Sequence, residues 1–75
     1  MIRYQNLGGT SGIRLYEIGT NSITVQFQDG STYLYNTSST SSDNISQMQR
    51  LAVAGRGLNS FISTVVKKGY AAKLR

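Results

Sequence analysis

The sequence predicts an α+β domain in which an antiparallel meander of three or four strands packs on two short helices. Two patterns predict it: strand-like segments separated by turn residues run from residue 13 to 36, with period-two alternation over residues 23–28, and apolar residues follow helical spacing between residues 45 and 66. A chain of 75 residues holds one small domain. We therefore expect a single domain over residues 1–75, with residues 1–9 as a flexible or exchanged arm.

The strands are predicted from alternation and turn residues. Residues 13–18 indicate a first strand, and the alternating residues 23–28 indicate a second, half-buried one. Asp29 and Gly30 then predict a two-residue type I′ hairpin turn, because that turn needs positive φ at both central positions. Residues 31–36 form the third strand, and residues 1–6 and 70–74 are candidates for further short strands.

The two-residue turn fixes a register and therefore the two faces of the sheet. It pairs Gln26 with Tyr33 and Val25 with Leu34, so Leu34 joins Ile23, Val25 and Phe27 on the core face. The opposite face then combines aromatic, aliphatic and hydrogen-bonding side chains: Leu15, Glu17, Thr24, Gln26, Tyr33 and Tyr35.

Two amphipathic helices follow a polar connector at residues 36–42. Asp43 or Asn44 is the predicted N-cap of the first helix, and Gln47 completes a capping box with Asn44. The glycines of segment 55–57 end this helix. A second helix follows, with Leu58, Phe61, Ile62, Val65 and Val66 on its apolar face. Gly69 is the predicted left-handed residue after that helix, with Tyr70 as its hydrophobic contact.

The composition excludes most catalytic and metal chemistry. The chain has no His and no Cys, so it offers no imidazole base, thiol nucleophile or ordinary transition-metal site. Of its three carboxylates, Asp29 is assigned to a turn and Asp43 to a helix cap, which leaves Glu17 without a paired acid or base. We expect no enzyme activity, no catalytic residue, no metal and no cofactor.

The positive charge is concentrated in the C-terminal part of the chain. Residues 44–75 carry six cations and no acid, whereas residues 1–43 are close to neutral. This asymmetry favours a phosphate-bearing partner, although a solvated surface with cations near a helix C-terminus is the simpler alternative. No apolar run approaches the ~20 residues that span a bilayer, so we expect no membrane association and a cytoplasmic location.

The candidate binding residues fall into three groups. Tyr33, Tyr35 and Tyr16 are predicted to stack on bases, and polar readout is assigned to Gln26, Thr24, Glu17, Thr10 and Ser11. Phosphate binding is assigned to Arg56, Gly57, Asn59, Ser60, Lys67, Lys68, Lys73 and Arg75. The same tyrosine face is equally suited to contact a second copy, or to be covered by the tail or a helix. For residues 55–57, a plain turn between helices is the competing interpretation.

Several ordered motifs resemble the KTSC domain, a family named from the C-terminus of some lysyl-tRNA synthetases and also found as stand-alone small proteins. The resemblance covers residues 10–74 and is carried by Thr10-Ser11-x-Ile13, Val25-x-Phe27-x-x-Gly30, Tyr33-Leu34-Tyr35, Gly55-Arg56-x-Leu58-Asn59-x-x-Ile62, and Tyr70 with Lys73-Leu74. It implies a small sheet packed on helices, a suspected RNA-binding role and no catalytic residues. A Ser/Thr stretch replaces the family's usual Val-Pro turn, and Gly57 replaces a usual aromatic residue.

These observations together predict non-catalytic binding of a phosphate-bearing nucleotide ligand. The ligand is RNA, single-stranded DNA, or a small cyclic or linear nucleotide signal that a homo-oligomer sequesters, as a viral immune-evasion protein would. Such a chain fits a phage or bacterial source. The alternative is a protein-interaction or oligomerisation module that uses the tyrosine face as its subunit contact.

Overall fold

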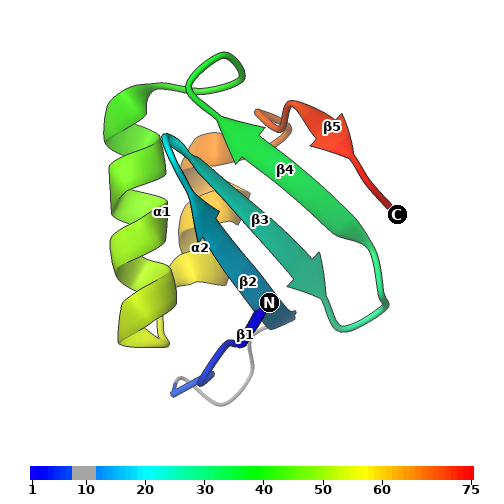
Figure 1. The fold of residues 1–75 in the computed structure, drawn as a ribbon. Helices are drawn as coiled ribbons and strands as arrows, with labels where there is room; N and C mark the ends of the chain where they lie inside the picture. The colour runs from blue at the N-terminus through cyan, green and yellow to red at the C-terminus, as the bar shows by residue number, and fades with distance from the viewer. Residues whose placement is uncertain (8–11) are drawn as a thin grey trace.

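A single antiparallel sheet organises the fold, with its strands in chain order (Figure 1). The computed structural model describes residues 1–7 and 12–75. Three longer strands, β2 (Ile13–Gly19), β3 (Ser22–Phe27) and β4 (Thr32–Asn36), pair in succession. The two-residue strands β1 (Ile2–Arg3) and β5 (Ala72–Lys73) pair with β2 and β4 at the two edges. The predicted α+β meander is thus confirmed, and both ends of the chain extend it.

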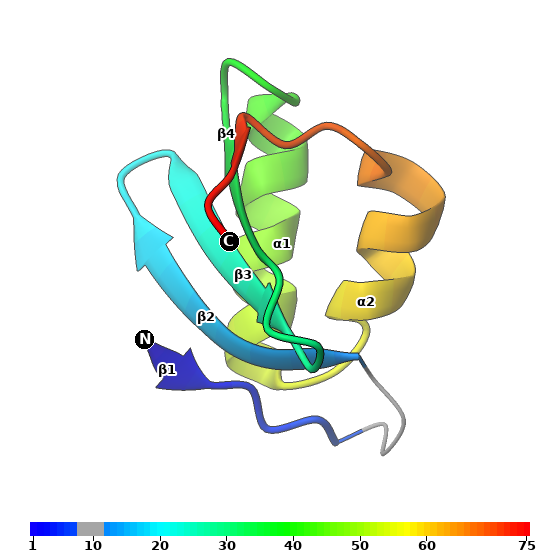
Figure 2. The ribbon, with the colours of Figure 1, turned by 90° about the vertical axis from the view of Figure 1, so that its right-hand side faces the viewer.

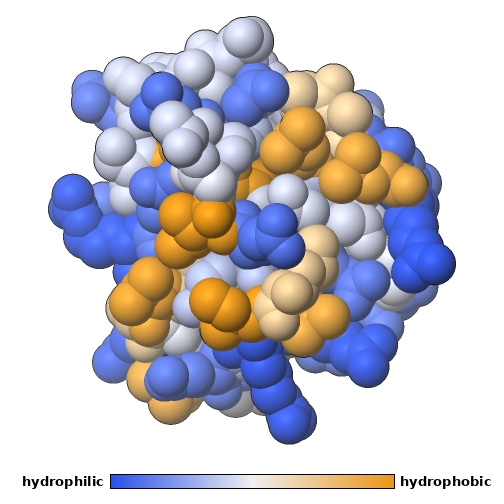
Figure 3. All heavy atoms as spheres, in the orientation of Figure 1, coloured by the Kyte–Doolittle hydropathy of each residue, from blue (hydrophilic) through white to orange (hydrophobic). Residues whose placement is uncertain are grey.

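All the helices lie on one face of the sheet. They are α1 (Ser42–Ala54), the short α2 (Leu58–Phe61) and the π-helix η1 (Ile62–Val66) that continues it (Figure 2). The opposite face of the sheet is left to solvent, and on it hydrophobic patches alternate with hydrophilic ones (Figure 3). The arrangement is a two-layer domain with one covered and one open sheet face.

The N-terminus of α1 differs from the prediction by two or three residues. Ser41, rather than Asp43 or Asn44, is the N-cap, and its hydroxyl accepts a hydrogen bond of 3.1 Å from the Asn44 backbone N–H. A serine hydroxyl at this position satisfies one of the free N–H groups of the first turn. The helix ends, as predicted, at Gly55, whose φ of 78° is left-handed.

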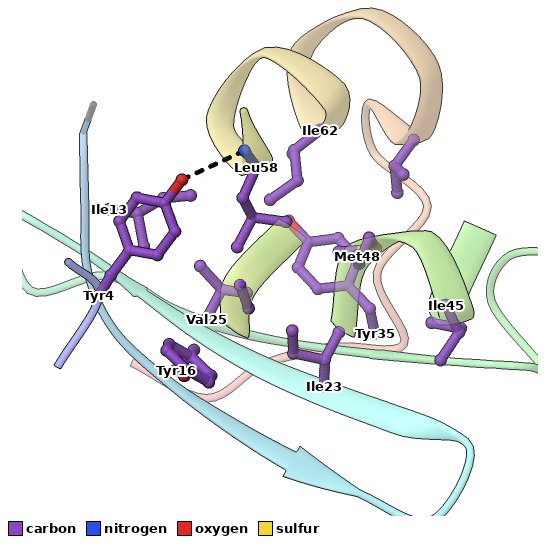
Figure 4. Packing of buried hydrophobic residues seen from close by; sticks show 12 residues of the cluster. Tyr4, Ile13, Tyr16, Ile23, Val25, Tyr35, Ile45, Met48, Leu58 and Ile62 are labelled. Atoms are coloured by element: carbon purple, nitrogen blue, oxygen red, sulfur yellow. Dashed lines mark hydrogen bonds between the residues drawn. The ribbon is translucent and has the colours of Figure 1, made fainter. Parts of the chain in front are cut away.

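The core lies between the sheet and the helices. Its most deeply buried side chains are Ile13, Ile23, Val25, Ile45, Met48 and Leu58 (Figure 4). The N-terminal segment is tied to this core by Tyr4, whose hydroxyl accepts a 3.3 Å hydrogen bond from the Leu58 backbone N–H. The described part of the N-terminal arm, residues 1–7, therefore packs on the core of its own chain.

The β3–β4 hairpin has a three-residue loop, and this overturns the predicted register. Phe27 pairs with Ser31 through a 2.8 Å hydrogen bond, and Gly30 N–H donates to the Phe27 carbonyl at 2.9 Å. Gly30 alone takes positive φ, +89°, so the loop is a turn followed by one left-handed residue rather than a type I′ turn. The extra loop residue shifts every pair of the hairpin by one position.

The shifted register turns the tyrosines to the other side of the sheet. Tyr33 pairs with Val25 and Tyr35 with Ile23, both of which are fully buried, so the two rings lie on the core face. Leu34, predicted in the core, instead pairs with Thr24 on the solvent face. The prediction that Tyr33 and Tyr35 share a face with Thr24 and Gln26 is therefore wrong.

The loop conformation predicts that replacement by Ala destabilises the protein more at Gly30 than at Gly12. A Cβ at Gly30 would meet no atom within 4 Å, so replacement by Ala carries only the backbone cost of φ +89°. We expect Gly30→Ala to lower the free energy of unfolding by about 1–2 kcal/mol. Gly12→Ala is the matched control, because that site is equally open and its φ lies outside the left-handed region. Equal urea midpoints for the two variants would contradict the loop assignment.

Candidate binding site

A cavity of about 530 Å³ opens on the covered face of the sheet, between the hairpin end of β3 and β4 and the C-terminal end of η1. The hairpin end of β3 and β4 extends beyond α1 and α2 (Figure 1). The shifted register directs aromatic side chains from the sheet into this space. Its wall contains four aromatic residues and two cations: Phe27, Tyr33, Tyr35, Tyr70, Lys67 and Lys68.

The aromatic residues form one connected cluster around Tyr33. The ring centroids of Tyr33 and Tyr70 are 4.7 Å apart, and those of Phe27 and Tyr33 are 5.8 Å apart in an edge-to-face arrangement. Tyr35 lies 6.3 Å from Tyr70 and is only 2% exposed, whereas Tyr70 is 37% exposed and Tyr33 half-buried. Tyr33 and Tyr70 therefore offer accessible ring surface above a buried Tyr35.

Three lysines surround this cluster. Lys67 and Lys68 follow η1 and line the cavity, and the Lys73 Nζ lies 5.8 Å from the centroid of the Tyr33 ring. Asp29 is the one acid in the wall. Hydrogen bonds from the Ser31 hydroxyl and backbone N–H, at 2.6 and 2.9 Å, hold the pKa of the Asp29 carboxyl below its usual range. The rim thus carries more positive than negative charge at neutral pH.

The backbone that carries Lys67 is strained. Its φ of 54° and ψ of −118° correspond to the first central position of a type II′ turn, which glycine normally occupies. The Gly69 N–H closes this turn on the Val66 carbonyl at 3.0 Å. A non-glycine residue in such a conformation costs about 1–3 kcal/mol. The predicted left-handed glycine at 69 is therefore wrong: the chain reverses two residues earlier, at a lysine.

Gly69 has a different reason to be glycine. A Cβ there would lie 3.0 Å from the Val66 carbonyl oxygen and 3.3 Å from that of Ser39. The close approach lets the chain pass from η1 back to the sheet edge. Tyr70 then follows directly and reaches the aromatic cluster.

A widened helical turn precedes the strained lysine. The Lys67 N–H donates to the Ile62 carbonyl, five residues back, rather than four back as in an α-helix. Leu58, Ile62 and Val66 are buried as predicted, whereas Val65 is 51% exposed. The extra residue in the turn rotates Val65 off the apolar face.

Several predicted site residues lie elsewhere. Tyr16 is buried against Tyr4, with ring centroids 6.5 Å apart, so its ring is not available for stacking. Glu17 and Thr24 are paired on the solvent face of the sheet, next to Gln26, and so face away from the cavity. The predicted readout residues Thr10 and Ser11 lie outside the described residues.

The remaining predicted phosphate ligands are also separate from the cavity. None of four predicted residues lines the cavity: Arg56 and Gly57, in the turn before α2, and Asn59 and Ser60, in α2. The first N–H of α2, that of Leu58, is already used by the Tyr4 hydroxyl. Arg75 continues the β5 edge through backbone hydrogen bonds with Thr32 and is exposed.

From the set predicted by sequence, the cavity thus brings together Tyr33, Tyr35, Lys67 and Lys68, with Lys73 beside them. The sequence predicts Phe27 in the core, Tyr70 at a helix cap and Asp29 in a turn, and it does not predict that all three line the cavity. The Asp29-Gly30 pair could have indicated the hairpin register, whereas no local signal places Tyr70 against Tyr33. The Asp29-Gly30 pair suits a three-residue loop as well as a two-residue one.

Comparison with known proteins gives no relative for this chain: no protein-family model, curated protein or solved structure matches it significantly. Among residues 1–7 and 12–75, no helix has the length and apolar character needed to cross a membrane. Within the same residues no group of three or more His, Cys, Asp or Glu side chains is placed to hold a metal ion.

The buried phenol gives a pH dependence that can be tested. Burial, reinforced by the neighbouring phenols of Tyr33 and Tyr70, raises the pKa of Tyr35 from 10.0 to about 12. The unfolded chain therefore loses this proton first. Its contribution to stability is complete below pH 10 and disappears as the pH rises through 12. Between pH 9 and 11, we expect wild type to lose about 1 kcal/mol more unfolding free energy than Tyr35→Phe, measured by urea titration. Equal losses would contradict the assignment.

The strained lysine gives a second prediction. Lys67→Gly should raise the free energy of unfolding by about 1 kcal/mol, because glycine adopts the observed φ without strain. Lys68→Gly is the control: Lys68 has no positive φ, and glycine there should cost about 0.5–1 kcal/mol. Thermal unfolding of the two variants measures the difference. A lower melting temperature for Lys67→Gly would show that the turn is relaxed with lysine.

Proposed function

We propose that this chain is a non-catalytic binding module for a phosphate-bearing nucleotide ligand, and that the cavity beside Tyr33 holds the base while Lys67 and Lys68 hold the phosphate. The observation that carries the proposal is the presence of accessible aromatic rings and paired lysines in one wall. A nucleotide combines an apolar, planar base with a charged phosphate, and the wall offers a counterpart to each.

The volume of the cavity and the arrangement of its aromatic rings support the proposal that it holds a base. At about 530 Å³, the cavity is within the roughly 300–1,000 Å³ of small-molecule sites. Tyr33 and Tyr70 meet at 53°, so a base that stacks on one ring meets the other at an inclined angle. Stacking on an aromatic side chain contributes about 1–3 kcal/mol per base.

The position of the two lysines supports the proposed phosphate site. Their charge lies at the rim of a largely apolar wall, where attraction to an anion is screened less than on an open surface. Lys67 also takes a conformation that glycine adopts more easily. Strained residues of this kind cluster at ligand sites, where the strain positions a functional group.

Binding without catalysis is part of the proposal. Asp29 is the one carboxylate in the wall, and its Oδ1 already accepts two hydrogen bonds from Ser31. The sequence contains no imidazole or thiol that could act as a partner base or nucleophile. The resemblance to the KTSC family, with its suspected RNA-binding role, belongs to the same proposal.

The competing function is a protein-interaction module with a tyrosine subunit contact. It is less well supported, because Tyr35 and Tyr16 are buried within the chain and Tyr33 is only partly accessible. A homo-oligomer remains part of our proposal where the ligand is a small nucleotide signal, since a second copy would close the open side of the cavity. A cytoplasmic location fits a fold that needs no disulfide.

Isothermal titration calorimetry with nucleoside monophosphates, a cyclic dinucleotide and short oligonucleotides tests the proposal. We expect at least one of these ligands to bind, and Tyr33→Leu, which keeps apolar bulk but removes the ring, to weaken binding about fivefold to a hundredfold. Lys68→Gln should weaken binding and reduce its dependence on salt.

Two control variants sharpen this test. Tyr33→Phe keeps the ring and should bind like wild type. Arg50→Gln removes one exposed positive charge on α1, away from the cavity, and should also leave affinity unchanged. The proposal fails if no nucleotide binds at millimolar concentration, or if Tyr33→Leu binds as tightly as Tyr33→Phe.

A further inference from the structure

A second cavity of about 540 Å³ lies at the same end of the sheet. It is formed by β1, the residues after it and the start of β2, and its wall is mainly polar. Two arginines, Arg3 and Arg14, contribute to it, and no carboxylate does. Both ribbon views place β1 and the β3–β4 hairpin at this end (Figures 1 and 2).

Gln28 separates the two cavities and lines both of them. Its backbone N–H donates to the Gly12 carbonyl at 2.7 Å, and its side-chain amide donates to the Ile13 carbonyl at 3.2 Å. We call the first cavity, beside Tyr33, the aromatic cavity, and the second, which contains the two arginines, the arginine cavity. Gly12 lines the aromatic cavity, and Ile13, the next residue, lines the arginine cavity. The two cavities are therefore neighbours across one side chain.

An irregularity in β2 accompanies this arrangement. Ile13 pairs with Phe27, but Leu15 pairs with Gln26, so Arg14 is an extra residue without a partner position in β3. Such a bulge changes the direction of a side chain relative to a regular strand. The bulged Arg14 and Arg3 of the adjacent β1 both line the arginine cavity.

The charge on these arginines is not neutralised within the described part of the chain. Its one salt bridge joins the Met1 amino group to Glu17 at 3.7 Å and involves neither arginine. Two guanidinium groups in a polar cavity without a carboxylate form a recognition surface for phosphate oxygens.

We propose that the ligand is a single-stranded nucleic acid whose backbone passes over Gln28, from the lysines of the aromatic cavity to Arg3 and Arg14. This inference rests on the proposed function, which assigns one base to the aromatic cavity. A mononucleotide fills that cavity alone and makes no contact with the arginines. A strand of several nucleotides places its next phosphates in the arginine cavity and gains affinity there.

Fluorescence anisotropy with labelled uridine and thymidine homopolymers of three, six and nine nucleotides tests the inference, with unlabelled UMP and TMP as competitors. We expect the double variant Arg3→Gln/Arg14→Gln to weaken oligonucleotide binding at least tenfold. Its slope of log affinity against log salt should become shallower by about 1.4, because each phosphate contact on a single strand contributes about 0.7. Mononucleotide affinity should change less than twofold.

The double variant Lys67→Gln/Lys68→Gln is the matched comparison, since it also removes two charges. It should weaken mononucleotides and oligonucleotides alike. Circular dichroism of both double variants verifies that the exposed substitutions leave the fold intact. The RNA and DNA series show which sugar the surface prefers.

Two results would overturn parts of the picture separately. If the arginine variant binds oligonucleotides with wild-type affinity and salt slope while the lysine variant binds them weakly, the path across Gln28 is wrong and the nucleotide site stands. If wild type binds neither mononucleotides nor oligonucleotides, the proposed function itself is wrong.

Discussion

Gly30 holds a left-handed backbone conformation that the β3–β4 hairpin requires, and the register of β4 and the candidate site depend on this one constraint. The conformation closes a loop of three residues, with the Asp29 carboxylate bound to Ser31 across it. Side chains alternate with period two along a strand, so one loop residue decides which side chains face the helices. Here it sends Tyr33 and Tyr35 inward and Leu34 outward.

The candidate site forms where this hairpin meets the C-terminal segment. The π-turn of η1 and the reversal at Lys67 bring Tyr70 back against Tyr33, and they leave two lysines at the rim. The helices stop short of the hairpin end, so these rings are only partly covered. The strained backbone of Lys67, the partly covered aromatic rings and the lysines of the rim thus occur at one place. This combination is more typical of a ligand site than of a turn that only connects two elements.

The positions of the cations in the fold differ from their grouping along the sequence. The sequence separates a nearly neutral first half from a strongly basic second half. In the fold, Lys67, Lys68 and Lys73 gather around Tyr33, while Arg56 and Arg75 lie outside the cavity wall. Arg3 and Arg14, from the half that looked neutral, line the neighbouring cavity. Net charge along the chain therefore does not predict which cations line the two cavities.

The sequence by itself determined the class of fold, the order of the three long strands, both helices and the break at Gly55. Each of these depends on periodicity or on residues close together in the chain. The absence of His and Cys also means that the sequence supplies no imidazole or thiol group. The tertiary structure alone decided the hairpin register, the burial of Tyr16 and Tyr35, and the meeting of Tyr70 with Tyr33. Asp29-Gly30 is compatible with loops of two or three residues, and packing of β4 against the helices selects between them, because only one register buries the larger apolar surface.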